Sequence, residues 1–218
     1  TGQARFCPDN GTRGLLEHQC RLRLSSIFSS ELKNNVSEVL KLGQKITVLP
    51  VIHGSGDFAI EVRRLMLNEQ FDHLAVPLPP SFQASVESGV EQLPCVSAVV
   101  QRTAPTEFHD NENSDIDAEA TYVPIDPCQP VIAALRIASQ EHILRTFIDI
   151  EDDFYEPAAD MLPDAYALKQ VSVERLAAAA LPTLAPPDEG PQTTRIHWMA
   201  NELHRLTKSY DSILLVCG

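Results

Sequence analysis

The sequence lacks several features that would identify a class of protein at once. Its five cysteines are odd in number and widely scattered, and no two have Cys-x-x-Cys spacing. We therefore expect neither a disulfide framework nor a zinc knuckle, and a reducing cytoplasm is the expected location. No apolar run approaches the roughly twenty residues that a membrane-spanning helix needs, so no membrane contact is expected.

Basic residues are scarce. The 218 residues include 17 Lys and Arg against 30 Asp and Glu, which gives a formal net charge of −13. This balance argues against a general binder of nucleic acids or anionic membranes, because both need basic surfaces. The acids are unevenly spread, and residues 107–119 hold six of them with no Lys or Arg. We interpret residues 103–120 as a mobile acidic loop, suited to a basic protein partner.

The motifs of common nucleotide-binding proteins and hydrolases are also missing. A small turn, His53-Gly54-Ser55-Gly56, precedes a helical pattern and could cradle a phosphate. However, it has neither GxGxxG spacing nor a GK[ST] ending, so a nucleotide site is not predicted. No GxSxG is present, which argues against a serine hydrolase of the common α/β type.

A continuous apolar stretch is the strongest feature that is present. Residues 46–52 are β-branched and aliphatic, interrupted only by Pro50, as in a strand buried on both faces of a parallel sheet. After the small turn, residues 57–69 have apolar side chains at helical spacing. The sequence therefore predicts a strand, a tight turn and a helix, with His53 at the carboxyl end of the strand.

The remaining chain repeats this alternation. Asp126 is expected to cap a helix that starts at Pro127, and Thr193 or Thr194 the last helix. Alternating strands and helices predict right-handed crossovers and a mostly parallel sheet, in a three-layer α/β domain over residues 45–218. We expect residues 46–52, 144–150 and 213–216 to be central strands, and residues 1–44 to form a helical extension. Further strands are predicted at 73–76, 95–101 and 122–125, and further helices at 81–93, 127–140 and 171–181.

Polar side chains follow several of these strands. Ligands of open parallel sheets bind beyond the carboxyl ends of the strands, where we expect His53, Asp126, Asp149 and Glu151. A His and carboxylates gathered there could bind a divalent metal and activate water. Each residue also has a structural interpretation: a hydrogen bond within the turn for His53, a helix cap for Asp126, and loop solvation for Asp149.

Residues 45–66, KITVLPVIHGSGDFAIEVRRLM, resemble the opening of the TraB/PrgY–GumN–Tiki superfamily, whose relatives include ChaN-like proteins and erythromycin esterases. They are most similar to an uncharacterised bacterial branch associated with MoxR ATPases and von Willebrand factor A proteins. The similarity continues through YVPIDPCQPVIAALRIAS at residues 122–139, RTFIDIE at 145–151, and RIHWMANELHRL and ILLVCG near the end. It covers roughly residues 45–218.

The resemblance implies an α/β domain with metal-dependent hydrolysis in some relatives. It suggests His53, Asp149 and Glu151 as catalytic residues and His53, Asp149 and Asp126 as ligands of Zn²⁺, Mn²⁺ or Co²⁺. The match is incomplete, because Pro77 stands where the family has an acid. The second Gly-x-x-His of the family would begin at Gly218, so we expect the chain to be a fragment.

Two functions follow from these observations. The first is a metal-dependent, hydrolase-like domain of a bacterial cytoplasmic protein, which His53 favours. The second is a non-catalytic protein-interaction domain in a larger assembly, which the replacement of the acid by Pro77 favours. The sequence does not indicate the substrate or the oligomeric state.

Overall fold

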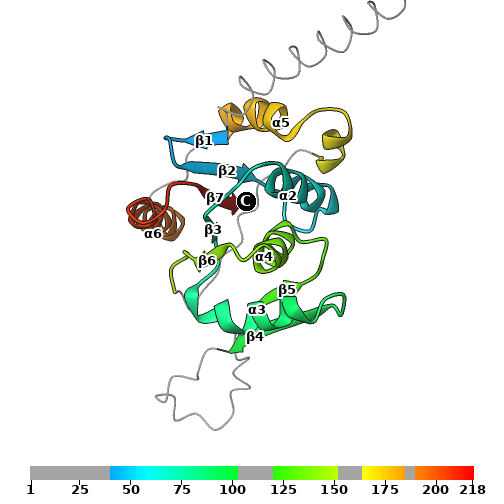
Figure 1. The fold of residues 1–218 in the computed structure, drawn as a ribbon, viewed down its shortest axis with the longest axis vertical. Helices are drawn as coiled ribbons and strands as arrows, with labels where there is room; N and C mark the ends of the chain where they lie inside the picture. Colours follow the sequence, from blue (N-terminus) through cyan, green and yellow to red (C-terminus); the bar gives the residue numbers. More distant parts are fainter. Residues whose placement is uncertain (1–39, 103–119, 152–163, 185–189) are drawn as a thin grey trace, which may run out of the picture. The chain divides into compact units, whose positions relative to one another are not determined.

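The computed structural model describes residues 40–102, 120–151, 164–184 and 190–218, and residues from Leu40 onward form one compact unit. Five strands form one sheet in the order β1-β2-β7-β3-β6, and β4 and β5 form a separate two-stranded ribbon (Figure 1). The strands are β1 (Lys41–Leu42), β2 (Ile46–Pro50), β3 (His73–Val76), β4 (Ser97–Arg102), β5 (Ala120–Ile125), β6 (Leu144–Phe147) and β7 (Ile213–Cys217). The helices are α2 (Gly56–Asn68), α3 (Gln83–Glu91), α4 (Pro130–Gln140), α5 (Val173–Ala180) and α6 (Pro191–Leu206), with short 3₁₀ turns η2 (Pro80–Phe82), η3 (Ala165–Lys169) and η4 (Leu181–Thr183).

The five-stranded sheet is mostly parallel, as the sequence predicts. Only β1 runs antiparallel to its neighbour, while β2, β7, β3 and β6 are parallel. The last strand, β7, inserts between β2 and β3, so that Ile213 pairs with both Ile46 and His73. The α/β class, the strand within residues 46–52 and the helix expected at 57–69 are confirmed.

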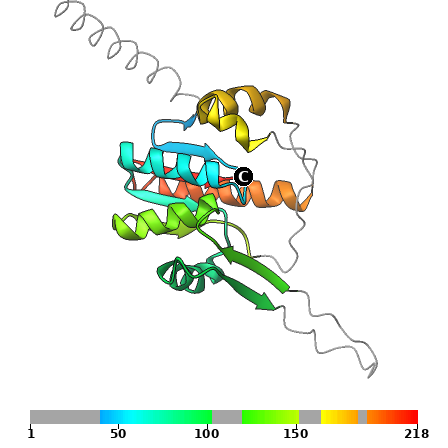
Figure 2. The ribbon, with the colours of Figure 1, turned by 90° about the vertical axis from the view of Figure 1, so that its right-hand side faces the viewer.

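Helices lie against both faces of this sheet (Figures 1 and 2). Alternate residues of a strand point to opposite faces, so each strand supplies two apolar cores. Leu74 and Val216 pack with α2 and α4 on one side, whereas Ile213 and Leu215 pack with Leu203 of α6 on the other. Each core excludes water from one face of the strands, which explains their nearly unbroken aliphatic character.

The β4–β5 ribbon corrects one expectation. Residues 95–101 were expected to join the alternating, mostly parallel sheet, but β4 pairs antiparallel with β5 outside that sheet. Its side chains alternate: Val99 and Val123 face the protein, and Val100 and Tyr122 face outward. Such alternation is typical of a strand covered on one face only. The inner face packs closely on α3, where a Cβ on Gly89 would lie 3.1 Å from the Ile125 side chain.

The expected central position of residues 144–150 is wrong, because β6 is the edge strand. Apolar composition reports how well the faces of a strand are covered, and it does not report whether both edges are paired. Phe147 and Ile148 are buried on the two faces, but Leu144 is 56% exposed. By contrast, residues 213–216 form the central strand β7, as predicted.

Two helix starts differ from the sequence prediction. Helix α4 begins at Pro130, with Gln129 as its N-cap, because the Asp126 carboxylate instead accepts a hydrogen bond from the Cys128 N–H (2.7 Å) and closes a separate turn. Helix α6 begins at Pro191, ahead of the expected caps at Thr193 or Thr194.

The extension at residues 1–39 and the acidic loop at 103–119 lie outside the described residues. No helix among those described is long and apolar enough to span a membrane.

Candidate functional site

The parallel strands end at one edge of the sheet, where the predicted site residues follow them. Val51, just after β2, donates its N–H to the Cys217 carbonyl (2.8 Å), so the ends of β2 and β7 stay paired. The His53 ring lies against Gly218, and a Cβ at Gly218 would come within 2.9 Å of its Nε2. His53 therefore occupies the end of the two strands at the centre of the sheet.

His53 lies in a turn fastened to the neighbouring helix. Gly54 adopts a φ of +76°, which favours glycine, and its N–H donates to the Gln129 side chain (2.8 Å). The structure records no hydrogen bond for the His53 side chain among the described residues, so its expected hydrogen bond within the turn is not seen. Partial loss of hydration lowers the pKa of His53 from 6.5, which favours the neutral imidazole at neutral pH.

Asp149 is held by a partner that the sequence did not suggest. It is 3% exposed, and Arg195 of α6 donates from Nε to Oδ1 (3.1 Å) and from Nη2 to Oδ2. The Ile150 N–H donates to Oδ1 as well (2.9 Å). Arg195 thus forms a two-point contact with a buried carboxylate. The pair joins the end of β6 to α6, and both carboxylate oxygens are occupied.

Glu151 has internal partners too. Its carboxylate accepts hydrogen bonds from the Ser81 N–H (2.7 Å) and the Ser81 hydroxyl (2.8 Å). Ser81 lies in η2, immediately before α3, so Glu151 satisfies a backbone donor that the helical turn leaves free. This contact connects the end of β6 to η2 and α3, which precede the β4–β5 ribbon in the chain.

The predicted metal ligands do not come together. The described residues contain no group of three or more His, Cys, Asp or Glu side chains arranged to hold a metal ion. Asp149 already bonds Arg195, and Asp126 bonds the Cys128 N–H. Among the described residues, His53 therefore lacks the two carboxylate partners that would complete a divalent-metal site. The donor set at this edge does not fit the metal that the family resemblance suggests.

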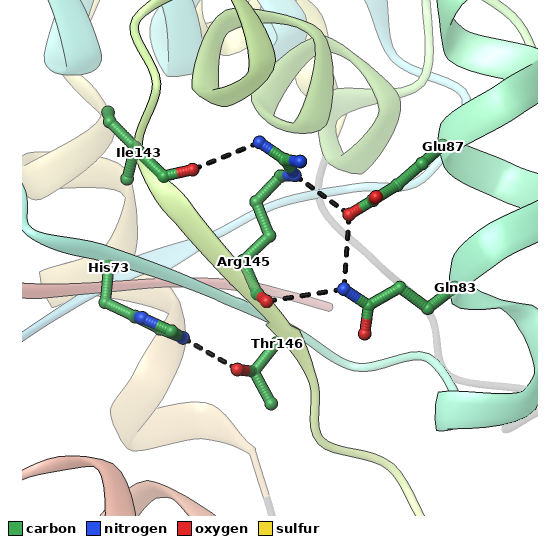
Figure 3. Close-up of polar contacts among 6 residues, drawn as sticks. All are labelled: His73, Gln83, Glu87, Ile143, Arg145 and Thr146. Carbon is green, nitrogen blue, oxygen red and sulfur yellow. Dashed lines mark hydrogen bonds and ion pairs between the residues drawn. The ribbon is translucent and has the colours of Figure 1, made fainter.

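A buried histidine at the amino ends of the parallel strands was not among the predicted site residues. His73 begins β3, is 2% exposed, and its Nε2 lies 2.8 Å from the Thr146 hydroxyl (Figure 3). Its ring lies against Tyr210, with the centroids 4.1 Å apart, while Nδ1 has no hydrogen-bond partner among the residues that the structure describes. Burial lowers the pKa of His73 from 6.5, because a protonated ring would be poorly solvated. The signal in the sequence is a histidine at the start of an apolar strand, HLAV.

A polar network near His73 fastens α3 to the edge strand (Figure 3). Arg145 of β6 donates to the Glu87 carboxylate (2.8 Å) and to the Ile143 carbonyl (3.1 Å). Gln83 donates to the Arg145 carbonyl (3.3 Å) and to Glu87 (3.2 Å). These side chains serve internal attachment, since each hydrogen bond joins two parts of the same domain.

The polar residues around the sheet therefore mainly connect its strands to α3 and α6, with His53 as the exception. Comparisons with family models, curated proteins and solved structures find no match to this chain. The resemblance to the TraB/PrgY–GumN–Tiki superfamily stays a prediction.

Proposed function

We propose that this domain is a protein-interaction domain without catalytic activity, which presents the outer face of the β4–β5 ribbon to a partner. One observation carries the proposal: a directly paired Val100 and Tyr122 project outward and are 56% and 67% exposed. Val96, just before β4, is 67% exposed as well. Contiguous exposed apolar side chains of this kind are typical of surfaces that bind other proteins.

The shape of the ribbon supports the same function. Among the described residues no further strand pairs with β4 or β5, and an unpaired edge can add a strand from another protein. Pro124 of β5 has no N–H to donate to a neighbouring strand. The edge of β4 has no such interruption. A partner would therefore pair better with β4, while its apolar side chains cover Val100 and Tyr122.

Charge indicates the chemistry of the partner. The segment that connects β4 to β5 carries six acids and no Lys or Arg, within a chain of net charge −13. A partner with a basic surface around an apolar centre would be steered toward the ribbon and held at its rim. The internal use of Asp149 and Glu151 gives further support, because neither carboxylate is available as a catalytic base.

The test compares capture of proteins from an extract by three forms of the domain. The wild type is matched with a ribbon variant, Val100→Ser with Tyr122→Ser, and with a control, Leu144→Ser. Leu144 is as exposed as Val100 but lies on β6, away from the ribbon. We expect a basic protein to bind the wild type and the control in a salt-sensitive way and to be lost from the ribbon variant. Equal binding by the ribbon variant would refute the proposal.

Hydrolysis centred on His53 is a second candidate. It is favoured by the position of His53 at the ends of the central strands and by its lowered pKa, since a neutral imidazole can accept a proton from water. The test is hydrolysis of p-nitrophenyl acetate by the wild type, His53→Ala and, as a control, His197→Ala on α6. A rate lost only in His53→Ala would support this candidate, and equal rates would exclude it for this substrate.

A further inference from the structure

A groove of about 690 Å³ lies between α2 and α4. Its lining includes neither the strand-end residues His53, Asp149 and Glu151 nor the exposed ribbon residues Val100 and Tyr122. Ala59, Leu93 and Ile137 are buried and give it an apolar floor, and Ile60, 62% exposed, forms part of one wall. Its size falls within the range of roughly 300–1,000 Å³ that is usual for small-molecule sites. The groove is partly open to solvent, and its apolar floor gives a short apolar chain a surface on which to lie.

Two arginines give the groove a positive charge. Arg63 comes from α2 and Arg136 from α4, and neither side chain makes an ion pair or hydrogen bond with a described residue. By contrast, Arg64, Arg145 and Arg205 are all ion-paired. Two guanidinium groups without an ion partner among the described residues therefore line one groove in a chain of net charge −13.

One acid, Asp57, lines the same groove. Asp57 lies 4.0 Å from the Lys169 ammonium, so its carboxylate already has a basic neighbour. Arg63 and Arg136 thus line the groove without an ion pair to a described residue, and two positive charges meet one negative charge there. The guanidinium group binds carboxylates in a two-point geometry, and the strength of that contact rises where neighbouring apolar surface excludes water.

We propose that this groove binds an amphipathic anion, a monocarboxylate on a straight apolar chain. The chain lies on Ala59, Leu93 and Ile137, and the carboxylate pairs with Arg63 and Arg136. Charge complementarity selects the anion, and the apolar floor selects a ligand with a chain over a small inorganic anion. This inference is independent of the proposed ribbon function, because no residue belongs to both surfaces.

Cys128 allows a direct test, because its exposed thiol lines the groove while Cys95, also exposed, does not. The probe is dodecanoate below its micelle concentration, and the readout is the rate of iodoacetamide alkylation at each cysteine, resolved by mass spectrometry. We expect dodecanoate to slow alkylation of Cys128 saturably and to leave Cys95 unchanged. Dodecyltrimethylammonium, with the same chain and a positive charge, should not protect Cys128.

Variants test the role of the arginines. Arg63→Gln with Arg136→Gln should weaken dodecanoate binding about tenfold or more, since both charged contacts are lost. Arg175→Gln is the matched control, because Arg175 is exposed on α5 and its side chain is also without an ion pair among the described residues. Each single variant is measured as well, so that the test holds if the double variant does not fold. Absence of saturable protection, equal protection by the cation, or wild-type binding by the variants would overturn the proposal.

Discussion

The carboxyl edge of the five-stranded sheet and the β4–β5 ribbon use their side chains in opposite ways. At the edge, the polar residues Asp149 and Glu151 are engaged by Arg195 and Ser81. On the ribbon, the apolar residues Val100 and Tyr122 pair with each other and are otherwise exposed. One region thus holds carboxylates that are already satisfied, and the other holds hydrophobic surface that is not covered.

This difference changes which region is the better candidate for function. A carboxylate at a strand end suggests a catalytic group only while its partners are unknown, because an internal ion pair uses the same residue type. An exposed pair of large apolar side chains has no comparable structural use. The carboxylates Asp149 and Glu151, which suggested catalysis, therefore form internal contacts. The apolar side chains of Val100 and Tyr122 are exposed and can contact a partner.

The largest effect should come from removing the buried carboxylate. Asp149→Ala breaks the ion pair with Arg195, and breaking a buried pair typically costs about 3–5 kcal/mol of unfolding free energy. Urea denaturation followed by circular dichroism measures this loss. The control is Asp211→Ala, which removes an exposed ion pair with Lys45 and should leave the midpoint nearly unchanged. A similar, small shift for both variants would show that Asp149 is not structural.

A second effect should appear as pH dependence from His73. Its pKa is lowered from 6.5 by burial, so the unfolded chain binds its proton more readily than the folded one. The stabilisation is therefore complete above about pH 6.5 and is lost as the pH falls through the lower pKa of the folded state. Urea unfolding at about pH 7.5 and about pH 5 should show a smaller drop for His73→Phe than for the wild type. His53 acts in the same direction and is unchanged in both proteins. An identical drop would contradict the account of His73.

A smaller loss is expected where the edge meets α3. Glu151→Ala removes the acceptor for the Ser81 N–H and hydroxyl, and loss of such a helix-start contact costs about 1 kcal/mol. Chemical denaturation again gives the free energy of unfolding. Glu141→Ala, an exposed residue at the end of α4, serves as the control and should have little effect. If the two variants are equally stable, the Glu151–Ser81 contact contributes nothing measurable.

The smallest change in stability should come from the outer face of the ribbon. Val100→Ser with Tyr122→Ser loses one exposed cross-strand pair, worth about 0.5 kcal/mol. Val123→Ser, on the buried inner face of the same ribbon, should cost considerably more. Thermal unfolding compares the two variants. A larger loss from the outer face would mean that this face already supports the fold.

Local periodicity in the sequence predicted much of the fold. The apolar run at residues 46–52 and the helical spacing at 57–69 correspond to β2 and α2, because burial on fixed faces leaves a pattern along the chain. The order of the strands was not predictable in this way. The insertion of β7 and the edge position of β6 depend on contacts between distant segments.

The site was harder to predict than the fold. The sequence located His53 and Asp149 at strand ends, but it gave no sign that Arg195, 46 residues further on, would reach Asp149. An ion pair between residues far apart in the sequence leaves no periodic pattern along the chain. The exposure of the outer face of the ribbon likewise could not be predicted from the sequence pattern.

The central claim is that the strand-end carboxylate is a structural group bound to Arg195. A double-mutant cycle with Asp149→Ala and Arg195→Met tests it most directly, since Met keeps most of the length and apolar character of the arginine stem. We expect the double variant to be more stable than the sum of the two single losses indicates, with a coupling of about 2–3 kcal/mol. Losses that add to within about 0.5 kcal/mol would mean that the two side chains act independently, and the structural role of Asp149 would be refuted.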